Sequence, residues 1–167
     1  IRDRLKGQSC ITLHDFMEPK KQIMVSRSFG KSIRSKSILS EAISFHASRA
    51  AEKLRYEKQK CRLITAFIRS NRFNTRVRQI YAAKSFELVH PTDDTRIIIK
   101  NANRILDQIF AEGYQYAKAG ILLSDFTNKY GYQMSLFDKK RDEKMASRLM
   151  ETVDYICLLY TSDAADE

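Results

Sequence analysis

Hydrophobic and polar residues alternate along four segments of this chain, with the period of two that is typical of half-buried β-strands. Gly30 is expected to close the first strand, and an arginine-rich polar loop, 71–79, separates the second strand from the third. The second and third segments are therefore predicted to form a hairpin with a long basic connection. The predicted strands are 21–29, 61–70, 81–89 and 116–126.

Two other segments carry apolar residues at three- and four-residue spacing, which predicts amphipathic helices. Ser37 is the expected N-cap of the first helix. Pro91 ends the preceding strand, Thr92 or Asp94 caps the second helix, and Gly113 lies where its C-cap belongs. The predicted apolar faces are Leu39, Ile43, His46, Ala47, Ala50 and Leu54 in the first helix, and Ile98, Ala102, Ile105, Leu106, Ile109 and Phe110 in the second.

The order of these elements is β-α-β-β-α-β, which predicts an α+β fold with a four-stranded antiparallel sheet and both helices on one face. The other face is then open, and we expect it to carry part of the basic surface. We expect residues 20–127 to form this domain and residues 1–19 to form a connector. Residues 128–156 form a tail, in which Met145, Leu149, Val153 and Ile156 predict a short helix.

Charge changes this picture, because the net charge of +10 is concentrated in one part of the chain. Residues 20–90 contain 17 Lys and Arg against 4 Asp and Glu, whereas the rest of the chain is slightly acidic. A basic segment of this kind is typical of a protein that binds a polyanion. A solvated basic surface without a partner is the alternative. A membrane surface fits less well, since the basic residues lie on strands and loops as well as on a helix.

Several classes of function find no support in the sequence. No apolar run is long enough to span a membrane, and no signal peptide is visible. Cys10, Cys61 and Cys157 are widely spaced, which predicts reduced thiols in a cytoplasm rather than disulfides or a metal site. Asp93 and Asp94 fit a helix cap better than a catalytic pair, and His46 fits a packed position. We expect no catalytic residue and no metal site in this chain.

Gln133, Leu136 and Phe137 form a Gln-x-x-Leu-Phe motif that follows the last predicted strand. In bacterial DNA-processing proteins such a motif binds the β sliding clamp: the Gln amide bonds the rim of a pocket, and the Leu and Phe side chains fill it. The end of a buried strand is the alternative interpretation.

The segment 22–30, Gln-Ile-Met-Val-Ser-Arg-Ser-Phe-Gly, resembles a hallmark of the Y-family DNA polymerases, most closely of the UmuC type that forms DNA polymerase V. Segments 50–55, 91–96 and 116–126 resemble further parts of that family, and the clamp motif follows in the expected order. The resemblance covers roughly residues 5 to 155. It implies the little finger, a βαββαβ module that lies on template–primer duplex during error-prone synthesis across damaged DNA in the SOS response.

The resemblance also implies which parts lie elsewhere. The catalytic palm, with carboxylates that hold Mg²⁺, would lie upstream of Ile1, so polymerase activity and its cofactor belong to a longer bacterial, cytoplasmic parent. UmuD and RecA are implied as partners. The residues expected to contact DNA phosphates are Arg27, Ser28, Lys31, Arg34, Arg62 and Lys84.

Three other interpretations stay open. An RNA-binding module shares the βαββαβ topology, but 26–30 lacks the paired aromatic residues of such domains. A clamp adaptor without DNA binding would depend on Leu136 and Phe137 alone. A polymerase IV-type enzyme shares the domain and a clamp motif. Finally, residues 157–167 resemble the translation of a sequencing adapter, and we exclude them from the fold prediction.

Overall fold

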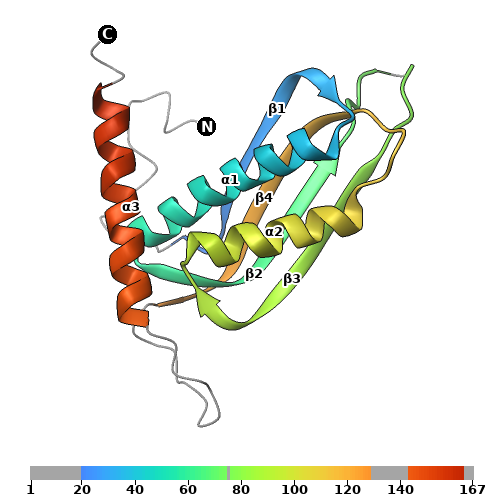
Figure 1. Ribbon diagram of the computed structural model, residues 1–167. Helices are drawn as coiled ribbons and strands as arrows, with labels where there is room; N and C mark the ends of the chain where they lie inside the picture. Colours follow the sequence, from blue (N-terminus) through green and yellow to red (C-terminus); the bar gives the residue numbers. More distant parts are fainter. Residues whose placement is uncertain (1–19, 75, 129–142, 164–167) are drawn as a thin grey trace, which may run out of the picture.

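The computed structural model describes residues 20–74, 76–128 and 143–163 (Figure 1). The elements, in chain order, are β1 (Ile23–Ile33), α1 (Lys36–Tyr56), β2 (Gln59–Arg69), β3 (Tyr81–Thr92), α2 (Thr95–Ile109), β4 (Tyr116–Asn128) and α3 (Glu143–Asp163). The strands form one sheet in the order β1-β4-β2-β3, and every neighbouring pair is antiparallel. The predicted α+β fold with βαββαβ order is confirmed.

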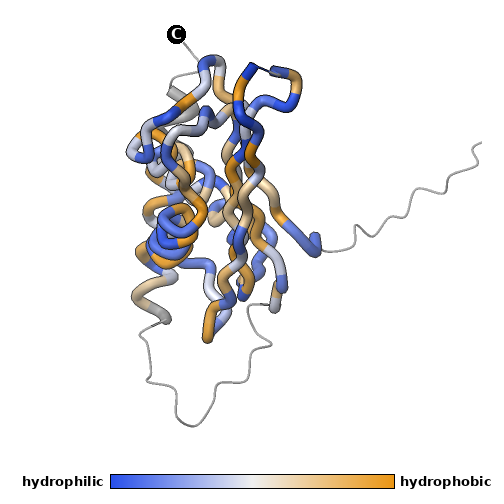
Figure 2. Tube along the Cα trace, turned by 90° about the vertical axis from the view of Figure 1, so that its right-hand side faces the viewer, coloured by the Kyte–Doolittle hydropathy of each residue, from blue (hydrophilic) through white to orange (hydrophobic). Residues whose placement is uncertain are grey.

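Helices α1 and α2 pack side by side on one face of the sheet, and the edge-on view in Figure 2 leaves its other face uncovered by them. Both predicted apolar stripes face the sheet. Leu39, Ile43 and Leu54 of α1 are fully buried there, as is Ile98 of α2. They meet alternate residues of the two central strands, such as Ile64 and Ile121. The alternation in the sequence therefore identified the core face of the sheet correctly.

Polar contacts fix how the two helices lie against each other. Ser40 Oγ donates to Asn103 Oδ1 at 2.8 Å, and Asn103 Nδ2 donates to Ser44 Oγ at 2.8 Å. Lys36 and Asp107 form an ion pair at 2.8 Å where α1 begins and α2 ends. One asparagine thus bridges two serines one helical turn apart, which sets the axial position of α2 along α1.

Several predicted boundaries differ from the structure. Strand β1 continues through Gly30 to Ile33, so this glycine does not close the strand. The N-cap of α1 is Ser35, not Ser37. Helix α2 ends at Ile109 with Phe110 as C-cap, whereas Gly113, at φ 83°, lies in the following loop. The glycine serves the turn into β4, where its positive φ costs little.

Pro91 lies within β3 rather than after it. This is compatible with its missing N–H because β3 is an edge strand, and a register shift interrupts the pairing between Cys61 and Leu63 of β2. As predicted, Asp94 caps α2: its carboxylate accepts a hydrogen bond from the backbone N–H of Arg96. Helix α3 is longer than the predicted helix in the tail.

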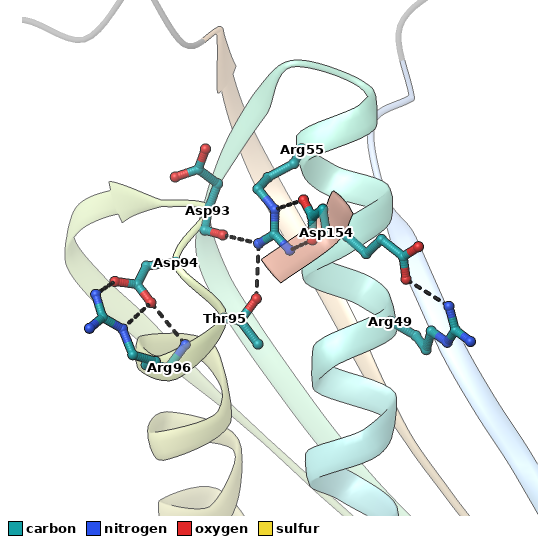
Figure 3. A network of polar contacts seen from close by, with 8 residues as sticks. Arg49, Arg55, Asp93, Asp94, Thr95, Arg96 and Asp154 are labelled. Carbon is teal, nitrogen blue, oxygen red and sulfur yellow. Dashed lines mark hydrogen bonds and ion pairs between the residues drawn. The ribbon is translucent and has the colours of Figure 1, made fainter. Parts of the chain in front are cut away.

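Arg55, near the end of α1, joins three elements (Figure 3). Its Nε and Nη2 bind the Asp154 carboxylate of α3 at 2.6 and 2.5 Å. Its Nη1 donates to the Asp93 carbonyl and to Thr95 Oγ1, at the start of α2. A planar guanidinium satisfies all these partners at once, so α3 is held against the end of the helical layer.

Candidate nucleic-acid interface

The open face of the sheet presents a different set of side chains from the core face. Residues that pair across the strands share a face, so the register orders the open face into transverse rows. Moving along the sheet, the rows are Ser28–Lys118–Arg69–Tyr81, then Ser26–Gly120–Phe67–Ala83, then Met24–Leu122–Thr65–Ser85, and finally Ser124–Leu63–Glu87. The face therefore changes from cationic at one end to a mixture of apolar and hydroxyl-bearing side chains in the middle.

The first of these rows is the most distinctive. Lys118 of β4 lies directly between Ser28 of β1 and Arg69 of β2, and Tyr81 of β3 completes the row. Neither cation has an ion-pair partner among the residues that the structure describes. Strands are spaced by about 4.8 Å, so the row spans roughly 14 Å. Two such cations flanked by two hydroxyl groups in a line can bind successive phosphate groups.

Further cations gather at the same end of the sheet, where β1 ends and β4 begins. The Lys and Arg residues there are Lys31, Arg34, Lys36, Arg69, Arg72, Arg76, Arg78 and Lys118, against Asp107 and Glu112. We call this the basic end. At the opposite end the described arginines are largely paired, as in Arg55–Asp154 and Arg96–Asp94. The charge of this domain is therefore polarised along its strands.

The middle of the open face is flat because Gly120 has no side chain. The Phe67 ring lies over this glycine, and a Cβ built there would be 2.5 Å from Phe67 Cζ and still closer to Ser26 Cβ. Thr65 and Ser85 are hydrogen-bonded to each other at 2.8 Å in the next row. The middle of the open face thus combines small and hydroxyl-bearing side chains with the apolar side chains of Met24, Leu122 and Phe67.

The structure places two of the predicted site residues on the helix side of the sheet. Arg27 pairs with Ala119, a core position, and lies near His46 of α1. Lys84 pairs with Ala66, also in the core, on the edge strand β3. Both are exposed, but they do not share the open face with the cationic row.

The other four predicted residues are distributed differently. Ser28 belongs to the cationic row, and Lys31 and Arg34 lie at the basic end, beyond the register shift of β1. Arg62 forms an ion pair with Glu87 at 2.7 Å near the opposite end. Ser28, Lys31 and Arg34 are thus brought together, whereas Arg62 is separated from them and neutralised.

Sequence reasoning missed Arg69 and Lys118, although each follows the alternation of its strand. Ile68 and Ala119 are core residues, so their neighbours had to face the opposite side of the sheet. What the sequence did not provide was the register that sets Lys118 beside Arg69. The clamp-motif residues Gln133, Leu136 and Phe137 lie outside the described residues.

Burial and hydrogen bonds within the fold account for the pKa shifts of His46, Asp94 and Cys61. Burial, followed by the charge of Arg27, lowers the pKa of His46, which is packed as predicted. Burial alone would raise the pKa of Asp94, but hydrogen bonds from Arg96 hold it below its usual range. Burial raises the pKa of the Cys61 thiol to about 12. Within the described ranges no three His, Cys, Asp or Glu side chains are grouped to hold a metal ion, and no helix is long and apolar enough to cross a membrane.

Comparison with known structures supports the fold. The chain is similar to part of a post-insertion binary complex of Dbh DNA polymerase, with a TM-score of 0.53, 11% identity, and coverage of 64% of this chain and 29% of that one. A ternary complex of Dbh gives a TM-score of 0.52 at the same identity and coverage. The predicted little-finger fold is therefore confirmed.

Comparison with known sequences gives the family. Protein SamB of Salmonella typhimurium is 42% identical over 152 residues, 91% of this chain and 36% of that protein. Protein ImpB of the same species is 43% identical over 150 residues, and Protein UmuC of Salmonella typhimurium strain LT2 is 36% identical over 152 residues. The chain spans about a third of the length of these relatives. A profile described as the impB/mucB/samB family C-terminal domain matches residues 20–136, and the chain therefore belongs to that family.

Proposed function

We propose that this domain grips template–primer DNA for a UmuC-type translesion polymerase, with its cationic row and basic end on the phosphates of the duplex. The observation that carries the proposal is the row Ser28–Lys118–Arg69–Tyr81 on a sheet face that no described helix covers. The row offers charge, and the next row, Ser26–Gly120–Phe67–Ala83, contains no Arg, Lys, Asn or Gln to read base edges. A polymerase that accepts any template sequence requires this kind of contact.

The wider role follows from the family rather than from the geometry of this domain. We propose that the parent protein acts in SOS mutagenesis in a bacterial cytoplasm, with a Mg²⁺-dependent palm in another part of that longer protein and with UmuD and RecA as partners. Gln133, Leu136 and Phe137 would tether it to the β sliding clamp. Retention of the chain on immobilised clamp, lost in Leu136→Ala/Phe137→Ala and kept in Arg69→Ala/Lys118→Ala, tests the tether separately from DNA binding.

The DNA-binding proposal is tested by removing the two unpaired cations of the row. The full chain and its Arg69→Ala/Lys118→Ala variant are titrated into labelled primer–template DNA, with binding followed by fluorescence anisotropy between ~50 and ~200 mM salt. Each phosphate contact contributes a log–log slope of about −0.9, so the variant should lose about 1.8 from the slope. If the two proteins bind equally at 1 M salt, this difference in slope makes the binding of the variant ~60-fold weaker than that of the parent at 0.1 M salt.

The matched control removes two charges from the helical layer instead. Lys53 of α1 and Lys100 of α2 are exposed and lie on the side of the sheet away from the row. Lys53→Ala/Lys100→Ala lowers the net charge equally, so it separates a local contact from a general effect of charge. Equal losses in both variants, or duplex binding that does not respond to salt, would refute the proposal.

A further inference from the structure

The β2–β3 loop, residues 71–79, extends the cationic row beyond the edge of the sheet. It is separated by one residue from Arg69 and by one residue from Tyr81, which are both members of the row. The loop contributes Arg72, Arg76 and Arg78 and contains no acidic residue. It lies at the end of the sheet where β1 ends and β4 begins (Figure 1). Any polyanion on the row would therefore meet this loop next.

Side chains of the described part of the loop, residues 71–74 and 76–79, form hydrogen bonds with its backbone. Gln79 Nε2 donates to the carbonyls of Asn71, Asn74 and Val77, at 3.0, 2.8 and 3.3 Å. Ser70 Oγ donates to Gln79 Oε1 at 2.9 Å and accepts from the backbone N–H of Ile80 at 2.9 Å. The Gln79 side chain thus links three backbone carbonyls of the loop, and its Oε1 accepts a hydrogen bond from Ser70 at the end of β2.

Phe73 is presented outward by this framework. The backbone N–H of Phe73 donates to Asn71 Oδ1 at 3.0 Å, which fixes the turn, while the side chain is 95% exposed. A phenylalanine in this position contributes almost no burial to the fold. Arg72 and Arg76 of the same loop are also exposed, and Arg78 stacks over Tyr114 of the neighbouring loop with its guanidinium carbon 4.8 Å from the ring centroid.

An exposed aromatic ring in a loop with exposed arginines is the combination that binds unpaired nucleotides. Bases stack on the ring, every base offers a π-face, and the cations meet the backbone between bases. Within a duplex the bases are already stacked, so Phe73 has nothing to stack on there. We propose that the loop 71–79 binds a single-stranded segment of DNA adjoining the duplex, with Phe73 stacked on an unpaired base. This inference rests on the proposed function of the cationic row and assigns a second part of the DNA to the loop.

The chain contains no tryptophan, so Phe73→Trp introduces a unique fluorescent reporter that keeps an aromatic face. Tyr56→Trp is the matched control, because Tyr56 is 86% exposed at the end of α1, away from the basic end. Each full-length variant is titrated with primer–template DNA carrying a 5′ single-stranded overhang and with blunt duplex of the same length. Stacking of a base should quench the emission of Phe73→Trp with overhang DNA only, and the emission of Tyr56→Trp with neither.

Affinity gives the second readout. Phe73→Ala should weaken binding of overhang DNA at least ~5-fold and leave blunt duplex unchanged, since a stacked base contributes ~1–3 kcal/mol. The side chain is exposed, so circular dichroism should show an unchanged fold. Absence of quenching when overhang DNA is saturated would overturn the inference and leave the proposed function intact. Absence of any DNA binding would overturn both, and tighter binding of single-stranded RNA of the same sequence would reassign the loop to RNA.

Discussion

Gly120 is the position where an added methyl group should disturb this fold most directly. In Gly120→Ala the new Cβ would lie 2.5 and 2.8 Å from Cζ and Cε1 of Phe67, and closer still to Ser26 Cβ. The Phe67 ring can swing away, at a cost of about 1 kcal/mol of apolar burial. The Ser26 Cβ cannot, because it is attached to the backbone of β1. The strands β1 and β4 must then separate locally, and overpacking of this kind costs about 1–3 kcal/mol.

We therefore expect Gly120→Ala to lower the free energy of unfolding by about 2–4 kcal/mol in total. Urea unfolding of the full chain, followed by circular dichroism, measures this difference from the shift in midpoint at constant slope. Gly30→Ala is the matched control, because an added Cβ there has no atom within 4 Å and Gly30 lies in the same sheet. Adding Phe67→Leu to Gly120→Ala should restore part of the loss. A Gly120→Ala midpoint equal to that of Gly30→Ala would show that the close approach in β4 does not constrain the sheet.

Three further predictions concern the polar and ionisable groups. Asp94→Asn keeps a capping side chain but not its charge, so near neutral pH it should be less stable than the parent by about 0.5–1 kcal/mol. The folded pKa of Asp94 is lowered, so the advantage is present above the unfolded value near 3.8 and is lost as pH falls through the folded value; a difference that persists at pH ~2 would contradict this cause. Arg55→Met should release α3 from α1, which would be seen as faster amide exchange in α3 than in β2. Arg49→Met is the control: it removes an ion pair with Glu52 within α1 and should leave amide exchange in α3 unchanged. In a Cys10→Ser/Cys157→Ser background, Cys61 should resist alkylation at pH ~8 until urea unfolds the chain, because its pKa is raised to about 12 and it is buried; rapid alkylation of the folded protein would refute this.

The fold was predictable because each element carries its own period. The stripe Leu39, Ile43 and Leu54 and the alternation of Ile64, Ala66 and Ile68 each have one interpretation, and their order leaves few topologies. The boundaries predicted at Gly30 and Gly113 are wrong for a reason that lies in the local backbone. Gly30 continues an edge strand without needing a positive φ. Phe110, not Gly113, is the C-cap of α2 because its backbone turns extended there, at φ −68° and ψ 131°, while its N–H still bonds to the Leu106 carbonyl.

The candidate site was less predictable because it depends on register between distant strands. Arg27 and Arg62 are predicted to contact phosphates from their places at the first strand and in the hairpin, but the pairing puts Arg27 on the helix side and gives Arg62 a partner in Glu87. Lys118 and Arg69 become neighbours only once β4 lies between β1 and β2. Long-range pairing of this kind leaves no trace in local composition.

The strand order also has a consequence for how the protein is made. The last strand of the sheet to be synthesised, β4, is also the one that joins β1 to the β2–β3 hairpin. A nascent chain that ends before Tyr116 can form the hairpin and both helices, but β1 has no neighbour to pair with. Contacts of such long sequence separation form slowly, and the unpaired strands are exposed to aggregation until they do. We therefore expect folding to be completed only after translation passes Asn128, so that truncation within β4 removes the whole domain rather than one strand.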